Sequence, residues 1–403
     1  MNSVNQENYE NNKLKYIYLD NAATMPISDS VKELMSKYSE EYYANASSDY
    51  KIAKETREIV EQSRRTISDI INCDADEIYF TSGGTESDNW AIKMIVEKMV
   101  SDKKRNRLLI SEIEHHAVIN AAKRLKEKGV DVEYIKVYEN GIINIDDFKR
   151  KINNRTYMVS VMMVNNEIGV IEPISMVSSI AKRYGALCHS DAVAAFGHIK
   201  IDVKKLKLDM MSASGHKFGS PKGVGFLYAK NNIKMYPFMN GGGQEKSLRA
   251  GTYNMNSIAG MAMAARNIYS DFDKKEVYLK NLQSHFVNRI LKEIPECKIN
   301  GDMMRRVSSN VNVSFKYINS NIVVKLLDSY GICASAGSAC NSDVHEPSHV
   351  IKAIKNNKEY INGTLRFTFN TNNTINELDY TVDVLKYIIF NMREINNKNK
   401  KMC

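Results

Sequence analysis

The feature that most constrains the fold of this chain is a series of short apolar runs that alternate with helical stretches between about residues 16 and 230. In the clearest run, Met158–Val164, Ser160 is the only polar residue. A strand without polar alternation is typical of a parallel sheet that helices cover on both faces. Strands and helices in alternation therefore predict βαβ units and an open α/β sheet. In such a sheet, ligands bind at the carboxyl ends of the strands.

Seven runs are predicted as strands of this sheet: Glu77–Thr81, Arg107–Ser111, Glu133–Val137, Tyr157–Val164, Leu187–Ser190, Met210–Ser212 and Gly225–Ala229. The stretches between them predict helices, among them Thr85–Val100, Ala117–Lys128 and Ile174–Tyr184. We therefore expect one large domain, residues 16–262, built around a mainly parallel seven-stranded sheet.

The pattern changes after Gly260. A long helical segment is predicted at Ile258–Leu291, and further elements follow at Ser309–Phe315 (strand), Ser320–Tyr330 (helix), Thr364–Phe369 (strand) and Ile375–Ile395 (helix). This mixture indicates a smaller α+β domain, residues 263–403 together with 1–15.

Composition excludes several other classes. The chain has 403 residues, of which 43% are hydrophobic and 26% charged, with only 6 Pro, so collagen-like, low-complexity and largely disordered chains are excluded. No apolar run approaches the ~18 residues that a membrane-spanning helix needs, and the polar N-terminus lacks the apolar core of a signal peptide. We therefore expect a cytoplasmic protein without membrane contact. The net charge, 56 − 47 = +9, comes from scattered residues without a basic–aromatic motif, so no direct nucleic-acid binding is expected.

The six cysteines lie far apart and form no CxxC pair. This spacing indicates neither a disulfide framework nor a zinc site, and no other metal-ligand constellation is present in the sequence. We therefore expect no metal site. What remains open is which cysteine is exposed and reactive.

The first candidate site is the segment Thr81–Asn89, which follows a strand and opens a helix. Gly83 and Gly84 let the backbone approach a ligand closely, and a helix N-terminus presents free N–H groups and a positive dipole end. With the hydroxyl of Thr85, the loop suits a phosphate group. The alternative is an ordinary strand–turn–helix in which Thr85 is the N-cap.

Two further candidates stand just past strand ends. Lys217 follows Ser214 and His216, and a buried lysine with a lowered pKa can form a Schiff base. The alternative is a surface lysine after a strand. Asp191 ends another strand, where a buried carboxylate needs a cationic partner such as a protonated pyridine nitrogen. Its alternative is a helix N-cap.

The three sites have one joint solution. A phosphate cradle, a Schiff-base lysine and an aspartate for a pyridinium nitrogen are the parts of a pyridoxal phosphate (PLP) site. Their common placement at strand ends favours that interpretation over three unrelated local structures.

Several motifs then resemble one family over nearly the whole chain, from residue 18 to residue 367. The sequence is similar to the cysteine desulfurases of the class V aminotransferase superfamily, in the branch of the bacterial NifS and IscS enzymes. The most specific matches are Phe80–Asn89, Glu114-His115, Val164–Gly169, Ser214–Lys217, Gly241–Glu245 and Gly337–Cys340. The resemblance implies a PLP-dependent transferase of fold type I, with the catalytic cysteine on a loop of the smaller domain.

The resemblance also implies roles for individual residues. Lys217 would carry PLP as the internal aldimine and act as a base, His115 would stack on the ring and assist proton transfer, and Cys340 would attack the substrate sulfur. Gly84, Thr85, Asn166, Asp191, Ser214 and His216 would hold the cofactor, with Thr252 reaching it from the second subunit of a homodimer. Arg366 and Asn166 would bind the substrate, since a guanidinium grips a carboxylate well.

These roles imply an L-cysteine desulfurase. L-cysteine would be converted to L-alanine while Cys340 takes up the sulfur as a persulfide. The small residues around Cys340, Ala334–Ser342, suit a cysteine that meets first the substrate and then an acceptor protein. The acceptor would be an iron–sulfur scaffold or a tRNA thiolation protein, and the sequence does not choose between them. Cys333 is expected to be a core residue.

Some positions depart from the family pattern. Ala194 stands where a Gln usually contacts the cofactor oxygen, a loss worth ~1 kcal/mol. Asn45–Tyr50 lacks the usual Pro and His, and Lys246 and Asn370-Thr371 replace typical residues. Alternatives are therefore another class V enzyme (a selenocysteine lyase, a β-lyase on a modified cysteine, or a transaminase) or a degenerate non-catalytic homologue. The intact Gly337–Cys340 motif favours the desulfurase, because a transaminase needs no thiol there.

Overall fold

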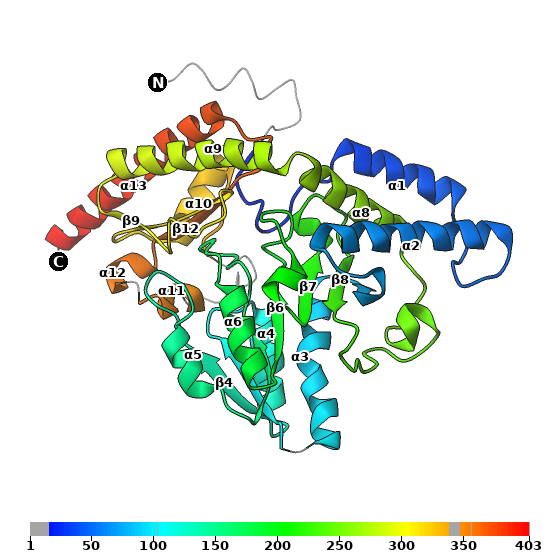
Figure 1. Ribbon diagram of the computed structural model, residues 1–403. Coiled ribbons are helices and arrows are strands. Elements are labelled where there is room, and N and C mark those ends of the chain that lie inside the picture. The colour runs from blue at the N-terminus through cyan, green and yellow to red at the C-terminus, as the bar shows by residue number, and fades with distance from the viewer. Residues whose placement is uncertain (1–15, 103, 338–346, 356, 403) are drawn as a thin grey trace. The chain divides into compact units, whose positions relative to one another are not determined.

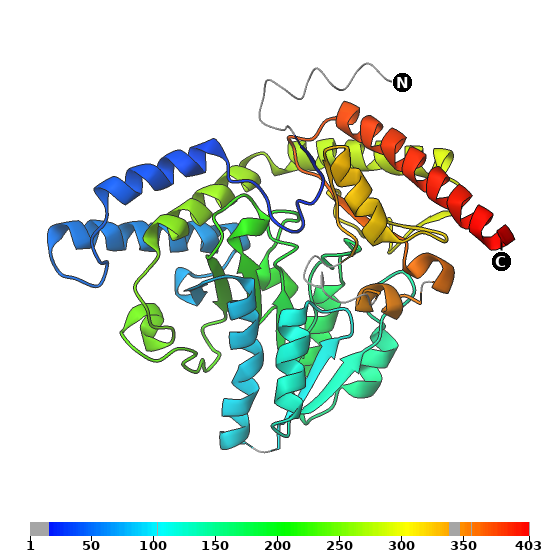
Figure 2. The same ribbon diagram turned by 180° about the vertical axis from the view of Figure 1, so that it is seen from behind.

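The computed structural model describes residues 16–102, 104–337, 347–355 and 357–402 (Figures 1 and 2). The chain divides into two compact units. The larger comprises residues 24–273 and 301–307, and the smaller comprises residues 1–23, 274–300 and 308–403. The boundary expected after residue 262 falls inside helix α8 (Met255–Ser270). Because Met261 and Ala265 of α8 are buried in the core of the larger unit, that unit extends to the end of this helix.

The larger unit is built on a seven-stranded sheet of strand order β2-β8-β7-β6-β5-β3-β4. Its strands are β2 (Ile78–Thr81), β3 (Arg107–Ser111), β4 (Asp131–Ile135), β5 (Thr156–Ser160), β6 (Leu187–Asp191), β7 (Met210–Ser214) and β8 (Gly225–Ala229). β8 runs antiparallel to both of its neighbours, and the other pairings are parallel. The expected α/β fold with a mainly parallel seven-stranded sheet is thus confirmed.

Successive strand residues enter two different cores, one on each face of the sheet. Met158 joins one apolar cluster and Val159 the other, and Met210 and Met211 divide in the same way. Helices α3 (Gly84–Ser101) and α4 (His116–Lys126) cover one face, and α2 (Lys51–Ile71), α5 (Ile145–Lys151), α6 (Ile174–Arg183) and α8 cover the other. This two-sided burial is the reason that these strands are apolar throughout.

The strand ends differ in detail from the sequence prediction. β5 ends at Ser160 and not at Val164, because β3 ends at Ser111. Beyond Ser160 the N–H groups of Val161 and Met163 still bond to β6, but the N–H of Met162 bonds to the Glu114 side chain and not to a strand backbone. The segment expected as one helix at Ile258–Leu291 is two helices, α8 and α9 (Phe272–Glu293), because the backbone leaves the helical region at Asp271.

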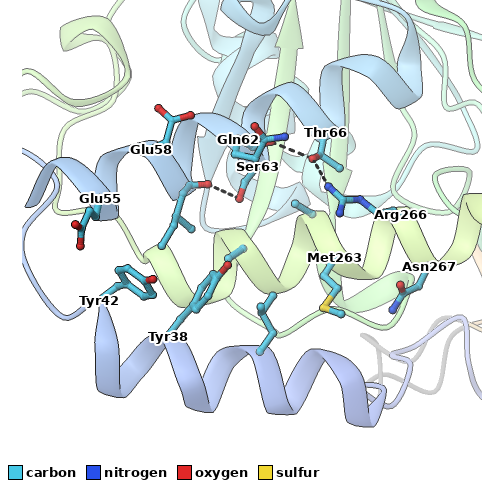
Figure 3. Close-up of a pocket in the computed structure, with 14 residues that line it drawn as sticks. Tyr38, Tyr42, Glu55, Glu58, Gln62, Ser63, Thr66, Met263, Arg266 and Asn267 are labelled. Carbon is cyan, nitrogen blue, oxygen red and sulfur yellow. Dashed lines mark hydrogen bonds between the residues drawn. The ribbon is translucent and has the colours of Figure 1, made fainter. Parts of the chain in front are cut away.

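Three helices of the larger unit lie side by side: α1 (Asp29–Glu41), α8 and α2. Figure 3 shows α8 between the other two, with a cavity of about 530 Å³ lined by Tyr38, Tyr42 and Arg266 among others. Arg266 donates to Thr66 there, 3.1 Å away. None of the residues predicted to hold a cofactor lines this cavity, so the candidate site lies elsewhere in the unit.

The smaller unit holds a three-stranded antiparallel sheet of order β12-β10-β9, formed by β9 (Cys297–Ile299), β10 (Asn310–Phe315) and β12 (Thr364–Thr368). A parallel pair, β1 (Ile17–Tyr18) with β11 (Ile332–Cys333), accompanies it. The helices are α9, most of which belongs here, α10 (Ser320–Ser329), α11 (His349–Ala353), α12 (Lys358–Ile361) and α13 (Ile375–Met402). In the part of the chain that the structure describes, no helix is long and apolar enough to cross a lipid bilayer.

A buried ion pair ties α2 to the segment after β8. Arg64 is 6% exposed, and its guanidinium donates to both carboxylate oxygens of Glu245 at 3.0 and 2.8 Å and to the carbonyl oxygen of Ile78 at 2.6 Å. Glu245 also accepts the N–H of Phe80 at 2.9 Å. The pair therefore fixes strand β2, which leads into the predicted phosphate loop.

Breaking this pair should destabilise the protein strongly. Arg64→Met leaves the Glu245 carboxylate buried without its counter-charge, which costs roughly 3–5 kcal/mol. At about 2–4 °C per kcal/mol for a unit of this size, we expect thermal unfolding to begin at least about 6 °C lower. The matched control is Arg65→Met on the same helix turn, because Arg65 pairs with Glu58 in an exposed position where a salt bridge contributes about 0–1 kcal/mol. Equal shifts in the two variants would contradict this.

Candidate functional site

The predicted phosphate loop joins β2 to α3. Helix α3 begins at Gly84, and its N-cap is Gly83, which has no side chain to cap the first turn. The alternative of Thr85 as an N-cap is therefore wrong. The capping residue offers no side-chain acceptor to the N–H groups of this first turn, and the helix dipole favours an anion beside them.

The loop packs closely on the neighbouring strand ends. A Cβ atom on Gly84 would lie 2.4 Å from a methyl carbon of Val193 and 3.4 Å from Ser214 Cβ. A Cβ on Gly225 of β8 would lie 2.7 Å from the Cα of Gly83. The absence of side chains at these positions thus brings the loop against the segments that follow β6 and β7.

Glu86 gives the loop a second anchor. Its carboxylate accepts the N–H of Ser82 at 2.9 Å and two guanidinium N–H groups of Arg249 at 2.8 and 3.1 Å. Although burial opposes ionisation, these hydrogen bonds lower the pKa of Glu86. Its charge is therefore compensated, and it does not repel an anion at the helix start.

Asp191, the last residue of β6, is buried at 3% exposure. Its Oδ1 atom accepts the N–H of Val193 at 2.8 Å, so it closes a short turn and caps no helix. Burial raises the pKa of Asp191 to about 6, while the Val193 N–H and the positive charge of Lys217 act in the opposite direction. Lys217 thus lies within electrostatic reach of Asp191, as the sequence interpretation requires.

Ser214 and Lys217 flank the turn that leaves β7. Ser214 ends the strand, and the short helix η2 (Gly215–Lys217) follows directly. Within η2, the Nδ1 atom of His216 lies 3.3 Å from the hydroxyl oxygen of Thr24. Burial, followed by the nearby charges of Lys217 and Lys222, lowers the pKa of His216 to about 4, so this imidazole is neutral at pH 7.

His115 is the N-cap of α4, and its Nδ1 atom accepts the N–H of Ala117 at 3.2 Å. The proton of the neutral ring therefore lies on Nε2. The segment after β5 is fixed by Asn165, whose amide donates to the Ile113 carbonyl at 3.0 Å. Asn166 follows it and is half-buried.

One buried acid was missed by the sequence analysis, which quoted Asp88 in the phosphate-loop motif without giving it a role. A carboxylate oxygen of Asp88, a ring nitrogen of His115 and a carboxylate oxygen of Asp191 lie within 4.8 Å of one another. A residue one helical turn after a loop points toward the same strand ends as the loop, and this periodicity was the signal that could have identified Asp88.

The remaining predicted residues lie in other segments of the chain. Thr252 is exposed in the segment after Gly251. Arg366 lies in β12 of the smaller unit, is 2% exposed, and donates to Asp20 at 2.7 Å. Cys340 lies outside the described residues. Burial, followed by the charges of Asp328 and Asp20, raises the pKa of the Cys333 thiol, which leaves it a poor nucleophile.

The residues of the larger unit fit PLP. Gly83 and Gly84 leave room at an uncapped helix start for a phosphate, and the buried carboxylate of Asp191 needs a cation such as a pyridinium nitrogen. Lys217, beside Asp191, supplies the amine for the aldehyde. Ala194 packs against the apolar core and offers no donor to a cofactor oxygen.

The aminotransferase class-V family model matches residues 17–381. A cysteine desulfurase IscS of Methanosarcina thermophila is 40% identical over 94% of each chain, and a cysteine desulfurase IscS of Rickettsia massiliae is 37% identical over 94% of this chain and 92% of the relative. Among solved structures, a NifS-like protein superposes with a TM-score of 0.87 at 31% identity, covering 93% of this chain and 99% of that one. SspA in complex with cysteine gives 0.78 at 31% identity, covering 88% and 99%.

The fold and the site define an enzyme of the PLP-dependent type, and the chain belongs to the class-V aminotransferase family. Its relatives at 40% identity bear the name cysteine desulfurase. The predicted family and the predicted cofactor are therefore confirmed.

A test of the cradle is Gly84→Ala. The added methyl group collides with Val193, and overpacking of this kind costs typically 1–3 kcal/mol, so PLP affinity should fall by roughly 5- to 150-fold. Titration of the apoprotein with PLP, followed by absorbance, measures this. The double variant Gly84→Ala/Val193→Ala should recover most of the loss. Gly243→Ala, where the nearest atom is 3.9 Å away, is the control. No rescue by Val193→Ala would show that the close approach is not the cause.

Proposed function

We propose that this protein is an L-cysteine desulfurase that converts L-cysteine to L-alanine and carries the sulfur as a persulfide on Cys340. The persulfide then passes to an acceptor protein that serves iron–sulfur cluster assembly or tRNA thiolation. We propose further that the enzyme works as a homodimer in the cytoplasm, in which Thr252 reaches the cofactor phosphate of the other subunit. The exposed position of Thr252 supports this arrangement.

The observation that carries the proposal is the electrostatic interaction of Lys217 with the buried Asp191, together with the uncapped start of α3. Each element of this set has an ordinary structural explanation when taken alone. Together they provide a carboxylate, an amine and an anion site at neighbouring strand ends, and the relatives that share the whole chain are named for desulfuration. No simpler ligand uses all three.

PLP supplies an electron sink for the bond at the substrate Cα. The N–H groups at the start of α3, with Thr85, Ser214 and His216, would hold its phosphate, and Gly84 keeps the loop close to the neighbouring strand ends. Asp191, whose orientation is fixed by the N–H of Val193, would supply the negative charge for the pyridine nitrogen. Asn166 would bind the phenolic oxygen.

The proton transfers fall to two side chains. Lys217 accepts the Cα proton through its Nζ atom and later returns a proton to the product. His115 would assist as the second group, with its proton on Nε2, since Nδ1 accepts the Ala117 N–H. Arg366 binds the substrate carboxylate through its planar guanidinium.

Sulfur transfer balances without an added oxidant. The Cys340 thiolate bonds to the substrate sulfur while the Cβ–S bond breaks, and the electron pair of that bond stays with the carbon fragment. Protonation of this fragment gives alanine, so cysteine and a thiol become alanine and a persulfide.

Replacement of Cys340 tests the nucleophile. Cys340→Ser should keep the absorbance of bound PLP but lose alanine release by at least roughly 100-fold, because the hydroxyl is a far weaker sulfur acceptor. Intact-protein mass after a single turnover with L-cysteine should show one added sulfur atom in the unmodified protein and none in the variant. Cys333→Ser is the control and should retain both. Persistent persulfide in Cys340→Ser would place the sulfur elsewhere.

Arg366→Lys tests the carboxylate clamp. A point-charge ammonium cannot form the two parallel hydrogen bonds of a guanidinium, so the KM for L-cysteine should rise by roughly tenfold or more. Because Arg366 also donates to Asp20, the thermal midpoint is measured alongside, and Asp20→Asn controls for that contact. An unchanged KM in a folded Arg366→Lys protein would remove Arg366 from substrate binding.

A further inference from the structure

Asp88 is a buried acid that the proposed mechanism does not use. It lies on α3, one turn after the phosphate loop, and is 1% exposed. Its Oδ1 atom has no hydrogen-bond partner among the described residues. Its carboxyl group is hydrogen-bonded to Ser212 on β7. A buried carboxylate with so few donors is expensive to keep ionised.

The groups that face Asp88 from the surrounding elements supply almost no positive charge. A carboxylate oxygen of Asp191 on β6 and a ring nitrogen of His115 at the start of α4 each lie within 4.8 Å of a carboxylate oxygen of Asp88. His189 faces Asp88 as well, with Nε2 at 3.8 Å from Oδ1. Burial lowers the pKa of His189 to about 3, so it is neutral. Glu114, also buried, adds a further acid nearby.

Two carboxyl groups this close cannot both be ionised without a large penalty, so one of them retains a proton. Their surroundings decide which one. Asp191 has the N–H of Val193 and the charge of Lys217, and both favour its anion. Asp88 has the hydroxyl of Ser212 and faces the charge of Asp191, so its pKa is raised well above the ordinary value by burial and then by Asp191.

We propose that Asp88 is a positioning residue that stays protonated at neutral pH and thereby leaves Asp191 as the single anion facing the pyridine nitrogen of the cofactor. This inference rests on the proposed function only for the identity of the group that Asp191 faces. An ionised Asp88 would share that cation with Asp191. When Asp88 is neutral, the negative charge of Asp191 alone acts on that cation.

A line of hydrogen bonds holds the neutral acid in place. Ser212 bonds to Asp88 and lies 3.0 Å from His189 Nε2, and His189 Nδ1 lies 2.8 Å from the hydroxyl oxygen of Ser160. The line crosses from α3 through β7 and β6 to β5. It therefore joins the helix that faces the phosphate to the strand that ends in Asp191.

Infrared difference spectroscopy tests the protonation state directly, and it needs no turnover. The spectrum of the PLP-loaded protein at pH 7 minus that of Asp88→Asn should show the loss of a protonated-carboxyl C=O band. Asp191→Asn should instead lose carboxylate bands. Glu172→Gln is the positive control, because burial raises the pKa of Glu172 to about 8 and this acid is also protonated at pH 7. Loss of carboxylate bands in Asp88→Asn would overturn the proposal.

A second readout is the affinity of the apoprotein for PLP. Asparagine mimics a neutral acid, so Asp88→Asn should bind PLP within about threefold of the unmodified protein at pH 7, with the same absorbance spectrum. A change of more than tenfold, in a variant that keeps its thermal midpoint, would show that a charge was removed. The infrared measurement is repeated on the apoprotein to distinguish failure of this proposal from failure of the proposed function. A protonated Asp88 in the apoprotein supports the proposal even if PLP does not bind.

If Asp88→Asn does not fold, the same band is followed in Asp191→Asn protein that carries carbon-13 aspartate. A protonated aspartate band at pH 7 that disappears at alkaline pH supports the assignment. Its absence at pH 7 overturns it.

Discussion

The buried pair between Arg64 and Glu245 is the interaction on which the cofactor side of the larger unit depends. Glu245 adopts a left-handed backbone conformation (φ 45°), and so do Lys246 and Ser247, at φ 59° and 62°. Three such residues in succession cost about 1–3 kcal/mol each, so the fold must hold them in place. The bidentate bond from Arg64 does this, together with the Phe80 N–H, and the chain then continues to Arg249, which binds Glu86 of the phosphate loop. The Arg64–Glu245 ion pair thus connects α2 and β2 to the segment whose Arg249 binds the phosphate loop.

The two acids on α3 near the phosphate loop, Glu86 and Asp88, differ in their charge, and this difference affects what the site can bind. Glu86 is paired with Arg249 and is ionised, while Asp88, two residues further along α3 and therefore on another side of the helix, interacts with Asp191. The same helix therefore presents an anion whose charge is cancelled and an acid that burial keeps neutral. The result is a positive helix start for phosphate and a single carboxylate for the pyridine nitrogen, which a uniform set of ionised acids would not give.

The sequence predicts the sheet well, because local apolar patterns encode it, and the same local patterns are the basis for the predicted cofactor residues. Apolar runs such as Met158–Val164 identify strands buried on both faces, and glycines before a helix identify the cradle. The sequence does not reveal α1 and α2 or the break at Asp271, since amphipathic helices that continue one another carry the same period.

Asp88 was missed for a different reason. Helical spacing places Asp88 one turn after Gly84, but its proposed role depends on Asp191, about a hundred residues away, and the sequence does not show that the two carboxyl groups meet.

The division of the chain into two units also separates two kinds of chemistry. Every residue proposed to hold PLP belongs to residues 24–273, whereas Arg366 and Cys340 belong to the segment from residue 308 onward. Under the proposed function, cofactor binding would depend on the parallel sheet and its strand ends, while recognition of the amino acid and acceptance of its sulfur would depend on residues of the other unit. Substitutions such as Asn370-Thr371 can then alter substrate preference without disturbing the cradle. Ala194 is the exception, because it lies beside Asp191 and changes the contacts that the cofactor itself receives.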